Sequence, residues 1–255
     1  MALTLTPLAG IPLIQPGDNL GEILFNAAQK TGLSWQEGDI LVLAQKIVSK
    51  AEGRLVDLST VTPSPAALDL AAASEKDPRL AELILQESQR VLRTRPGTVI
   101  VEHRLGFVCA NAGIDHSNVR GEGEQTEDWV LLLPCDPDAS AGKIRAYLEA
   151  ATGVRLGVLV IDSHGRTWRL GTVGASIGMS GMPGLVDLRG EPDLFGFRLR
   201  ITQVGAADEL AAAASLVMGQ AAEGTPAVHA RGFPYPLREG SLKELIRPSE
   251  SDLFR

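Results

Sequence analysis

The longest apolar stretches of this sequence are only as long as a buried β-strand. The segments DILVLA (residues 39–44) and LGVLVI (residues 156–161) are the clearest of them. A membrane helix needs about 20 predominantly apolar residues, so neither segment is long enough to cross a bilayer as a helix. Short apolar runs bounded by polar or turn residues are typical of strands inside a sheet. We therefore expect a water-soluble protein built around a buried sheet.

Helical and strand-like patterns alternate along the rest of the chain. Apolar residues at helical spacing predict helices over residues 20–31 (capped by Asp18 or Asn19), from residue 65, and over residues 79–92, 136–152 and 208–222. Further strands are predicted at residues 3–5, 98–102, 107–110, 129–133, 173–177, 199–203 and 227–230. Because there is no regular βαβ period, the pattern favours an α+β fold with mixed sheets over a doubly wound parallel sheet.

Composition and length narrow the class of protein. The chain has 255 residues, of which 44 % are hydrophobic and 22 % charged, and this balance excludes a disordered or fibrous chain. We expect a single unit over residues 1–255, with any division into interleaved subdomains near residues 121–127 or Pro134. The net charge of −7 argues against a general nucleic-acid-binding protein.

The two cysteines and the N-terminal sequence indicate a cytoplasmic protein. Cys109 and Cys135 are too few for a disulfide framework or a zinc cluster, and Cys109 lies in an apolar segment typical of the core. The start, MALTLTPLAG, lacks the charged and apolar regions of a signal peptide.

Several common catalytic motifs are missing from the sequence. It has no G-x-x-x-x-G-K-[ST] phosphate loop, no G-x-G-x-x-G after a strand, no H-E-x-x-H, no paired C-x-x-C and no G-x-S-x-G. A Walker-type nucleotide site, a zinc protease and a serine hydrolase are therefore excluded.

Two aspartates follow predicted strands at the start of polar segments. Asp115 lies in NAGIDHSN and Asp162 in VIDSHGR. Carboxylates held by the end of a sheet suit hard cations such as Mg²⁺ or Mn²⁺, with positions left open for phosphate oxygens. Ser163 offers a further oxygen ligand, and Asn118 a hydrogen bond to a base, ribose or phosphate. From these short strings alone, turn capping by the aspartates is the favoured interpretation.

Basic and glycine-containing segments are further candidates for binding an anion. Lys46 and Lys50 follow a predicted strand and suit phosphate, although solvated lysines at a helix start explain them as well. Arg166 and Arg169 flank Trp168, which suits a carboxylate, a phosphate or a ring, or else a structural tryptophan. The glycines of residues 218–226 let a nucleotide approach the backbone, or simply end a helix that begins at Asp208.

Eight blocks along the chain, taken together, resemble the coenzyme F-420 γ-glutamyl ligase family. In order, they are IPLIQPGD, GDILVLAQKIVSKAEGR, FVCANAGIDHSN, LLLPCDPDASAGKIR, VLVIDSHGR, DLRGEPDLFGF, ADELAAAASLVMG and TPAVHARG. The resemblance implies GTP-dependent addition of L-glutamate, and possible further γ-linked glutamates, to the phospholactyl carboxylate of a 5-deazaflavin through an acyl phosphate.

The same resemblance implies the residues of the site. Asp115 and Asp162 correspond to ligands of one divalent ion, Mg²⁺ or Mn²⁺, and Ser163 to a ligand of a second. Gln220 stands where some relatives have a carboxylate, which weakens the second site. The residues implied to contact GTP are Ile11, Pro12, Leu13, Ile14, Gln45, Lys46, Lys50, Asn118, Met218, Gly219, Gln220, Ala221, Ala222, Glu223, Gly224 and Thr225.

The resemblance also sets expectations about partners. It implies an intertwined homodimer, adds a monovalent cation (K⁺) as an option, and leads us to expect no fused nitroreductase domain. No residue is assigned as general base. Two alternatives stay open: another metal-dependent carboxylate–amine ligase or phosphotransferase, and a non-catalytic module that binds a nucleotide or flavin.

Overall fold

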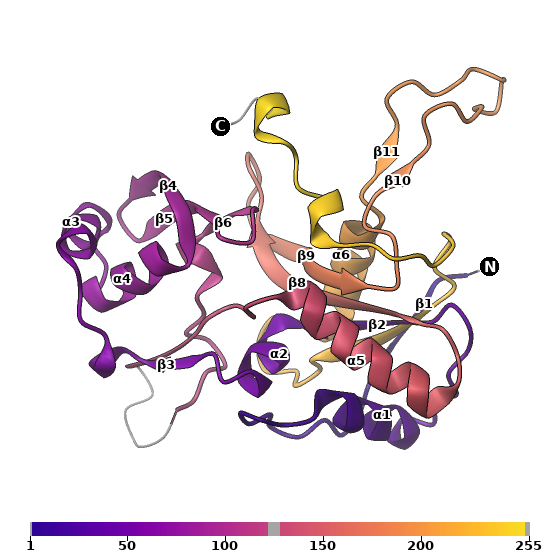
Figure 1. Cartoon of the computed structure of the whole chain (residues 1–255), viewed down its shortest axis with the longest axis horizontal. Coiled ribbons are helices and arrows are strands. Elements are labelled where there is room, and N and C mark those ends of the chain that lie inside the picture. The colour runs from indigo at the N-terminus through magenta and orange to yellow at the C-terminus, as the bar shows by residue number, and fades with distance from the viewer. Residues whose placement is uncertain (1, 122–127, 253–255) are drawn as a thin grey trace.

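The computed structural model describes residues 2–121 and 128–252 (Figure 1). Its strands are β1 (Thr4–Pro7), β2 (Ile40–Ala44), β3 (Leu55–Asp57), β4 (Ser88–Arg95), β5 (Thr98–His103), β6 (Val108–Ala110), β7 (Trp129–Leu131), β8 (Gly157–Gly165), β9 (Thr172–Ser180), β10 (Val186–Asp187), β11 (Gln203–Val204) and β12 (Ala227–Arg231). Its α-helices are α1 (Leu20–Lys30), α2 (Gln45–Ala51), α3 (Pro65–Ser74), α4 (Pro78–Gln86), α5 (Pro137–Thr152) and α6 (Ala206–Met218). Short 3₁₀-helices are η1 (Leu58–Thr60), η2 (Asn111–Gly113), η4 (Leu242–Glu244) and η5 (Ser249–Ser251). The predicted α+β class is confirmed.

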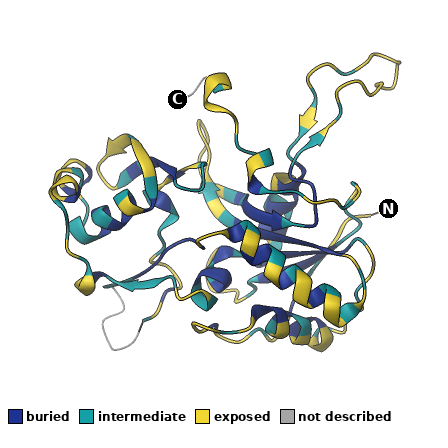
Figure 2. Ribbon diagram, viewed as in Figure 1, coloured by how far each residue is buried: buried dark blue, intermediate teal, exposed yellow. Residues whose placement is uncertain are grey.

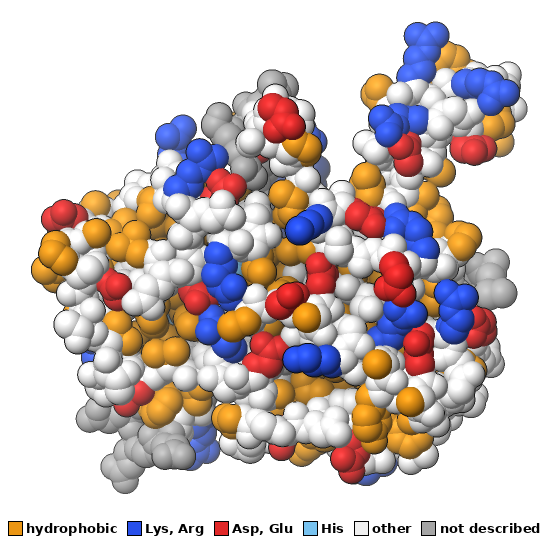
Figure 3. Space-filling view, in the orientation of Figure 1, with side chains coloured by type: hydrophobic (Ala, Val, Ile, Leu, Met, Phe, Trp, Pro, Cys, Tyr) orange, Lys and Arg blue, Asp and Glu red, His pale blue; other side chains and the backbone are white. Residues whose placement is uncertain are grey.

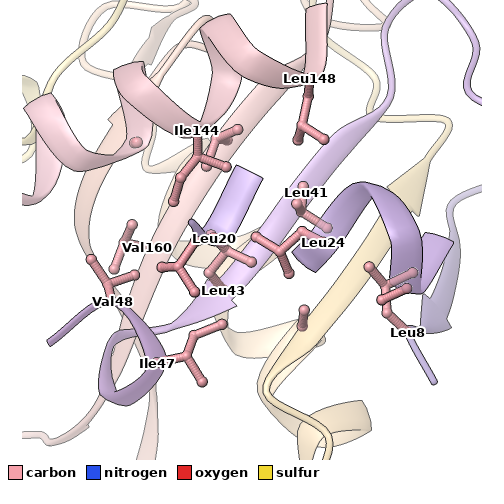
Figure 4. Packing of buried hydrophobic residues seen from close by; sticks show 14 of the residues in the cluster. Leu8, Leu20, Leu24, Leu41, Leu43, Ile47, Val48, Ile144, Leu148 and Val160 are labelled. Atoms are coloured by element: carbon pink, nitrogen blue, oxygen red, sulfur yellow. The ribbon is translucent and has the colours of Figure 1, made fainter. Parts of the chain in front are cut away.

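The two strand-sized apolar segments form the centre of the main sheet. This sheet has the order β1-β12-β2-β8-β9, in which β2 and β8 are parallel and the other neighbouring pairs are antiparallel. Leu41 and Leu43 pack in the cluster shared with α1 and α5 (Figure 4). Ile40 and Val42 pack in the cluster shared with α6. The sheet is therefore covered by helices on both faces, which is why its central strands are apolar throughout (Figure 2).

Capping side chains set where two of the covering helices begin. The Asn19 side chain accepts a hydrogen bond from Glu22 N at the start of α1, and Asp136 accepts one from Ala139 N at the start of α5. The alternative caps have other partners: Asp18 accepts from Gln15 N, and Asp138 accepts from Met179 N and Leu242 N. Asp138 thus ties α5 to β9 and to the C-terminal segment.

Glycines in β9 allow helices to approach the sheet closely on both faces. A Cβ at Gly174 would lie 2.3 Å from the carbonyl oxygen of Ala211 in α6, and one at Gly178 would lie 2.5 Å from backbone of Pro137 in α5. The β8–β9 register shifts opposite Val160 and Ile161, so the strand alternation is interrupted between these two glycines. The position of α6 matters for function, because the loop that follows it contains several candidate nucleotide contacts.

A second group of elements lies to one side of the main sheet (Figure 1). It contains the sheet β4-β5-β6, the pair β3-β7 and the helices α3 and α4. Its buried apolar residues form a cluster of their own, in which Ile84, Val99 and Val130 are fully buried. The predicted boundary at residues 121–127 falls mostly outside the described residues, and the division into subdomains stays a prediction.

Three predicted elements are wrong in extent. The helix predicted over residues 79–92 ends at Gln86, because residues 88–95 pair with β5 as strand β4. The helix predicted to residue 222 ends at Met218, where Gly219 adopts a positive φ of 75°. Of the strand predicted at residues 199–203, only Gln203 is in a strand, because β11 consists of Gln203 and Val204 and the preceding segment has no continuous partner strand.

Residues 186–204 form a projecting arm, defined by the pair β10-β11 at its base (Figure 1). Backbone bonds such as Leu188 N to Thr202 O hold its two sides together.

Over residues 2–121 and 128–252, no helix is both long and apolar enough to cross a membrane.

Candidate active site

A cavity of about 760 Å³ lies where the C-terminal ends of β2 and β8 meet loops from other parts of the chain. Its volume is within the range of small-molecule sites. Every residue implied to contact the nucleotide or metal lines it: Ile11, Pro12, Leu13, Ile14, Gln45, Lys46, Lys50, Asn118, Met218, Gly219, Gln220, Ala221, Ala222, Glu223, Gly224, Thr225, Asp115, Asp162 and Ser163. Five separate segments of the sequence are thus brought together, while the roles of these residues stay predictions.

The parallel pairing of β2 with β8 explains how two of these segments meet. Ala44 pairs with Ile161, so Gln45 and Asp162 follow at the same edge of the sheet. The prediction that Asp162 begins a loop is wrong, since β8 continues to Gly165 and Asp162 pairs with Ala175 of β9. The hairpin extends beyond the apolar segment because its backbone hydrogen bonds do not require apolar side chains.

Asp115 is held in place through both its backbone and its side chain. It follows the 3₁₀-helix η2 instead of a strand end, which corrects the prediction, and its N–H and C=O bond to Leu131 at 3.0 and 2.9 Å. Its Oδ2 accepts a hydrogen bond from Gln45 Nε2 at 2.6 Å and pairs with the Lys46 ammonium. Burial raises the pKa of Asp115 above its ordinary value, although Lys46 opposes this shift and Asp162 adds to it.

Asp162 has a different electrostatic environment. Burial favours its neutral form, but three groups together outweigh this effect and lower the pKa of Asp162: His164, whose Nε2 lies 3.1 Å from Asp162 Oδ2, the Ser163 backbone and Lys46. The contact with His164 has the distance of an ion pair without the angles of a hydrogen bond. His164 also lines the cavity and was not predicted as a site residue. Its distance along the sequence from Asp162 could have indicated it, because residues i and i+2 of a strand lie on the same face.

Ser163 and Gln220 meet across the cavity. The Ser163 hydroxyl donates to Gln220 Oε1 at 2.8 Å, although the residues are 57 positions apart. Both are exposed, and both offer oxygen atoms, which hard divalent cations prefer. Their proximity is consistent with the implied second metal, with an amide oxygen in place of a carboxylate.

Lys50 and Asn118 link three of the segments that line the cavity. Lys50 Nζ donates to Asn118 O at 2.8 Å, and Asn118 Nδ2 donates to Ala221 O at 2.9 Å. Asn118 has a φ of 56°, in the left-handed region that asparagine tolerates better than most residues. Burial and the nearby Lys46 ammonium lower the pKa of Lys50. Lys46 and Lys50 are therefore built into the site, and the interpretation of both as solvated surface lysines is wrong.

The remaining candidates have other surroundings. Arg166, Trp168 and Arg169 occupy the tip of the β8–β9 hairpin and do not line the cavity; the Trp168 side chain is 94 % exposed. Asp208, near the start of α6, accepts a hydrogen bond from Ser176 N, a structural role. Cys109 lines the cavity but is a buried core residue as predicted, and burial raises the pKa of its thiol to about 12, which disfavours the reactive thiolate.

Comparison with known proteins gives a consistent result. A family model described as F420-0:Gamma-glutamyl ligase matches residues 10–232. The coenzyme F420:L-glutamate ligase of Methanothermobacter thermautotrophicus is 48 % identical and the match covers 100 % of both chains. The proteins of the same name from Methanopyrus kandleri (46 %, covering 95 % of this chain and 93 % of that protein) and Archaeoglobus fulgidus (40 %, covering 100 % and 97 %) are also similar. The chain therefore belongs to the F420-0:gamma-glutamyl ligase family.

Proposed function

We propose that this protein is a GTP- and divalent-metal-dependent ligase that adds L-glutamate to the phospholactyl carboxylate of a 5-deazaflavin, coenzyme F420-0. The observation that carries the proposal is the convergence of Asp115, Asp162, Lys46 and Lys50 on one cavity. The substrate class comes from the relatives, which are named coenzyme F420:L-glutamate ligases and match this chain over nearly their whole length.

The donor groups in the cavity suit Mg²⁺ or Mn²⁺. Mg²⁺ is usually bound by one or two carboxylates together with water and substrate phosphates, and Asp115 and Asp162 provide such a pair. Among the described residues, no cluster of three or more His, Cys, Asp or Glu side chains forms a metal cage. Two carboxylates leave positions open for water and substrate phosphates, so the site fits a catalytic metal better than a fully coordinated structural metal. When bound, the metal would neutralise and polarise the phosphate oxygens.

The reaction explains why positive charge is needed here. One oxygen of the acceptor carboxylate attacks the γ-phosphorus of GTP, the bond to the bridging oxygen breaks and GDP leaves. The glutamate nitrogen then attacks the carbonyl carbon of the acyl phosphate, the C–O bond breaks, phosphate leaves and the nitrogen loses a proton. The first step brings two anions together, and Lys46 and Lys50 reduce their repulsion.

The direct test uses GTP, L-glutamate and the unglutamylated deazaflavin, with Mg²⁺ or Mn²⁺. We expect the mass of the deazaflavin to increase by one glutamyl unit for each GDP formed, and no increase when glutamate or the metal is omitted. If no glutamyl unit is added with either metal, the proposal is wrong. GDP formed only with another carboxylate acceptor would instead support the alternative ligase.

We also propose that the protein is a homodimer in which the arm packs against the second copy. Leu194, Phe195 and Ile201 of the arm are each at least 87 % exposed, and hydrophobic side chains are visible on the arm in Figure 3. Large apolar patches usually mark interaction surfaces. Sedimentation analysis should give twice the chain mass, and the double variant Leu194→Ser, Phe195→Ser should shift it toward one chain mass. A wild type that sediments as a monomer at micromolar concentration would contradict this.

A further inference from the structure

Helix α2 contains a hydrogen-bonded chain that ends on Asp115. Ser49 Oγ donates to Gln45 Oε1 at 2.8 Å, and Gln45 Nε2 donates to Asp115 Oδ2 at 2.6 Å. Ser49 and Gln45 are four residues apart, so they lie one above the other on the same face of the helix. Both are almost completely buried, with exposed fractions of 0 % and 1 %. Gln45 lines the cavity, whereas Ser49 lies behind it and does not.

The Gln45 amide has a donor group and an acceptor oxygen, and only the donor group suits Asp115. An ionised carboxylate accepts hydrogen bonds and donates none, so it is stabilised by the amide NH₂ group and repelled by the amide oxygen. The Ser49 hydroxyl donates to that oxygen and holds it away from Asp115. Because a buried amide oxygen without a donor is unfavourable, removing the hydroxyl lets the amide rotate or shift.

Gln45 is a more rigid restraint on Asp115 than Lys46 is. Both contact Asp115 Oδ2, but the Lys46 side chain is partly exposed and lysine is a flexible point charge. Gln45 lies on a helix anchored in the core by Ile47 and Val48 (Figure 4). No hydrogen bond to Asp115 Oδ1 is found from any of the described residues. The arrangement therefore restrains one carboxylate oxygen and leaves the other for a ligand.

We infer that Ser49 is a positioning residue for the divalent-metal site: it orients the Gln45 amide, which in turn orients the Asp115 carboxylate. This inference rests on the proposed metal role of Asp115. It also gives Gln45 a function beyond the nucleotide contact implied by the family resemblance. Residues that orient metal ligands in this way typically change metal affinity by about 10- to 100-fold when removed.

The experiment measures Mn²⁺ binding to the purified full-length protein without nucleotide, from the electron paramagnetic resonance signal of free Mn²⁺. We expect Ser49→Ala to weaken Mn²⁺ binding about tenfold. Ser49→Thr keeps the hydroxyl and should restore affinity to within about threefold of the wild type. The matched control is Ser74→Ala, because Ser74 is an equally buried helical serine whose hydroxyl donates to Leu70 O, away from the site.

A double-mutant cycle separates positioning from a general effect on the fold. If Ser49 acts through Gln45, then Ser49→Ala should change Mn²⁺ affinity little in a Gln45→Ala background. Equal affinity of Ser49→Ala and the wild type would overturn the inference, and so would an equal loss in Ser74→Ala or additive losses in the cycle. Ligase activity in the wild type together with unchanged Mn²⁺ affinity in Ser49→Ala would overturn this inference alone, whereas absent ligase activity in the wild type would count against the proposed function.

Discussion

Replacing Asp115 by Asn is expected to reduce the rate of glutamate addition by about 1,000-fold, because a metal ligand contributes several kcal/mol to stabilising charge at the phosphoryl group. Asn keeps the size of the side chain and an oxygen that accepts from Gln45, but it loses the negative charge that binds the cation. The measurement is the initial rate of glutamyl-deazaflavin formation at saturating GTP and Mn²⁺.

The fold should survive this substitution. Burial raises the pKa of Asp115, so the folded state favours the neutral acid more than the unfolded chain does, and the charge costs stability above that pKa. Removing the charge therefore should not lower the melting temperature by more than a few degrees. Asp69→Asn, an exposed position on α3, is the control and should keep full activity. An Asp115→Asn protein with an unchanged rate would remove this residue from the metal role.

Replacing Asp39 by Ala is expected to lower the free energy of unfolding by about 3–5 kcal/mol, the usual cost of breaking a buried ion pair. Asp39 is 1 % exposed and accepts hydrogen bonds from Arg231 Nε at 2.8 Å and from Gln36 N at 2.8 Å. His229 Nε2 lies 2.8 Å from its Oδ2, and Trp35 packs edge-on against His229. Asp39 precedes β2 and Arg231 ends β12, so the contacts of Asp39 link two neighbouring strands of the main sheet. Urea unfolding followed by circular dichroism measures the loss.

A matched substitution tests whether burial causes the effect. Asp187 makes the same pairing with an arginine, Arg189, but on the surface of the arm, so Asp187→Ala should unfold almost like the wild type. If both substitutions cost the same, burial of the Asp39 cluster does not explain its contribution.

The contribution of Asp39 should also depend on pH in a defined direction. Burial raises its pKa, but the hydrogen bonds from Arg231 and Gln36 and the close contact with His229 outweigh burial and lower the pKa from 3.8 to about 2. A lowered carboxyl pKa stabilises the folded state fully above about pH 4, and this stabilisation is lost as the pH falls toward 2. The difference in unfolding free energy between wild type and Asp39→Ala should therefore shrink between pH 5 and pH 2. A difference that is constant over this range would contradict the assigned ionisation.

Much of the local structure is determined by the sequence itself. The apolar segments at residues 39–44 and 156–161 predicted the central strands, because a segment buried on both faces must be apolar at every position. Helical periodicity and capping residues predicted α1 and α5, because both depend on residues only three or four positions apart. Eight ordered sequence blocks also indicated the family resemblance, which the comparisons confirmed. The residues that the resemblance implied for the site all line the cavity.

Features that depend on distant partners were decided by the tertiary structure. Residues 88–95 carry apolar side chains compatible with a helix, yet they form β4 because β5 offers a partner for their backbone. Asp162 extends a strand instead of beginning a loop for the same reason, since β9 pairs with it. Both aspartates were predicted from the sequence, but only the fold shows that Gln45, hydrogen-bonded to Ser49, contacts Asp115, and that His164 lies beside Asp162. Periodicity and capping act within a few residues, whereas these contacts depend on which strands pair across the whole chain.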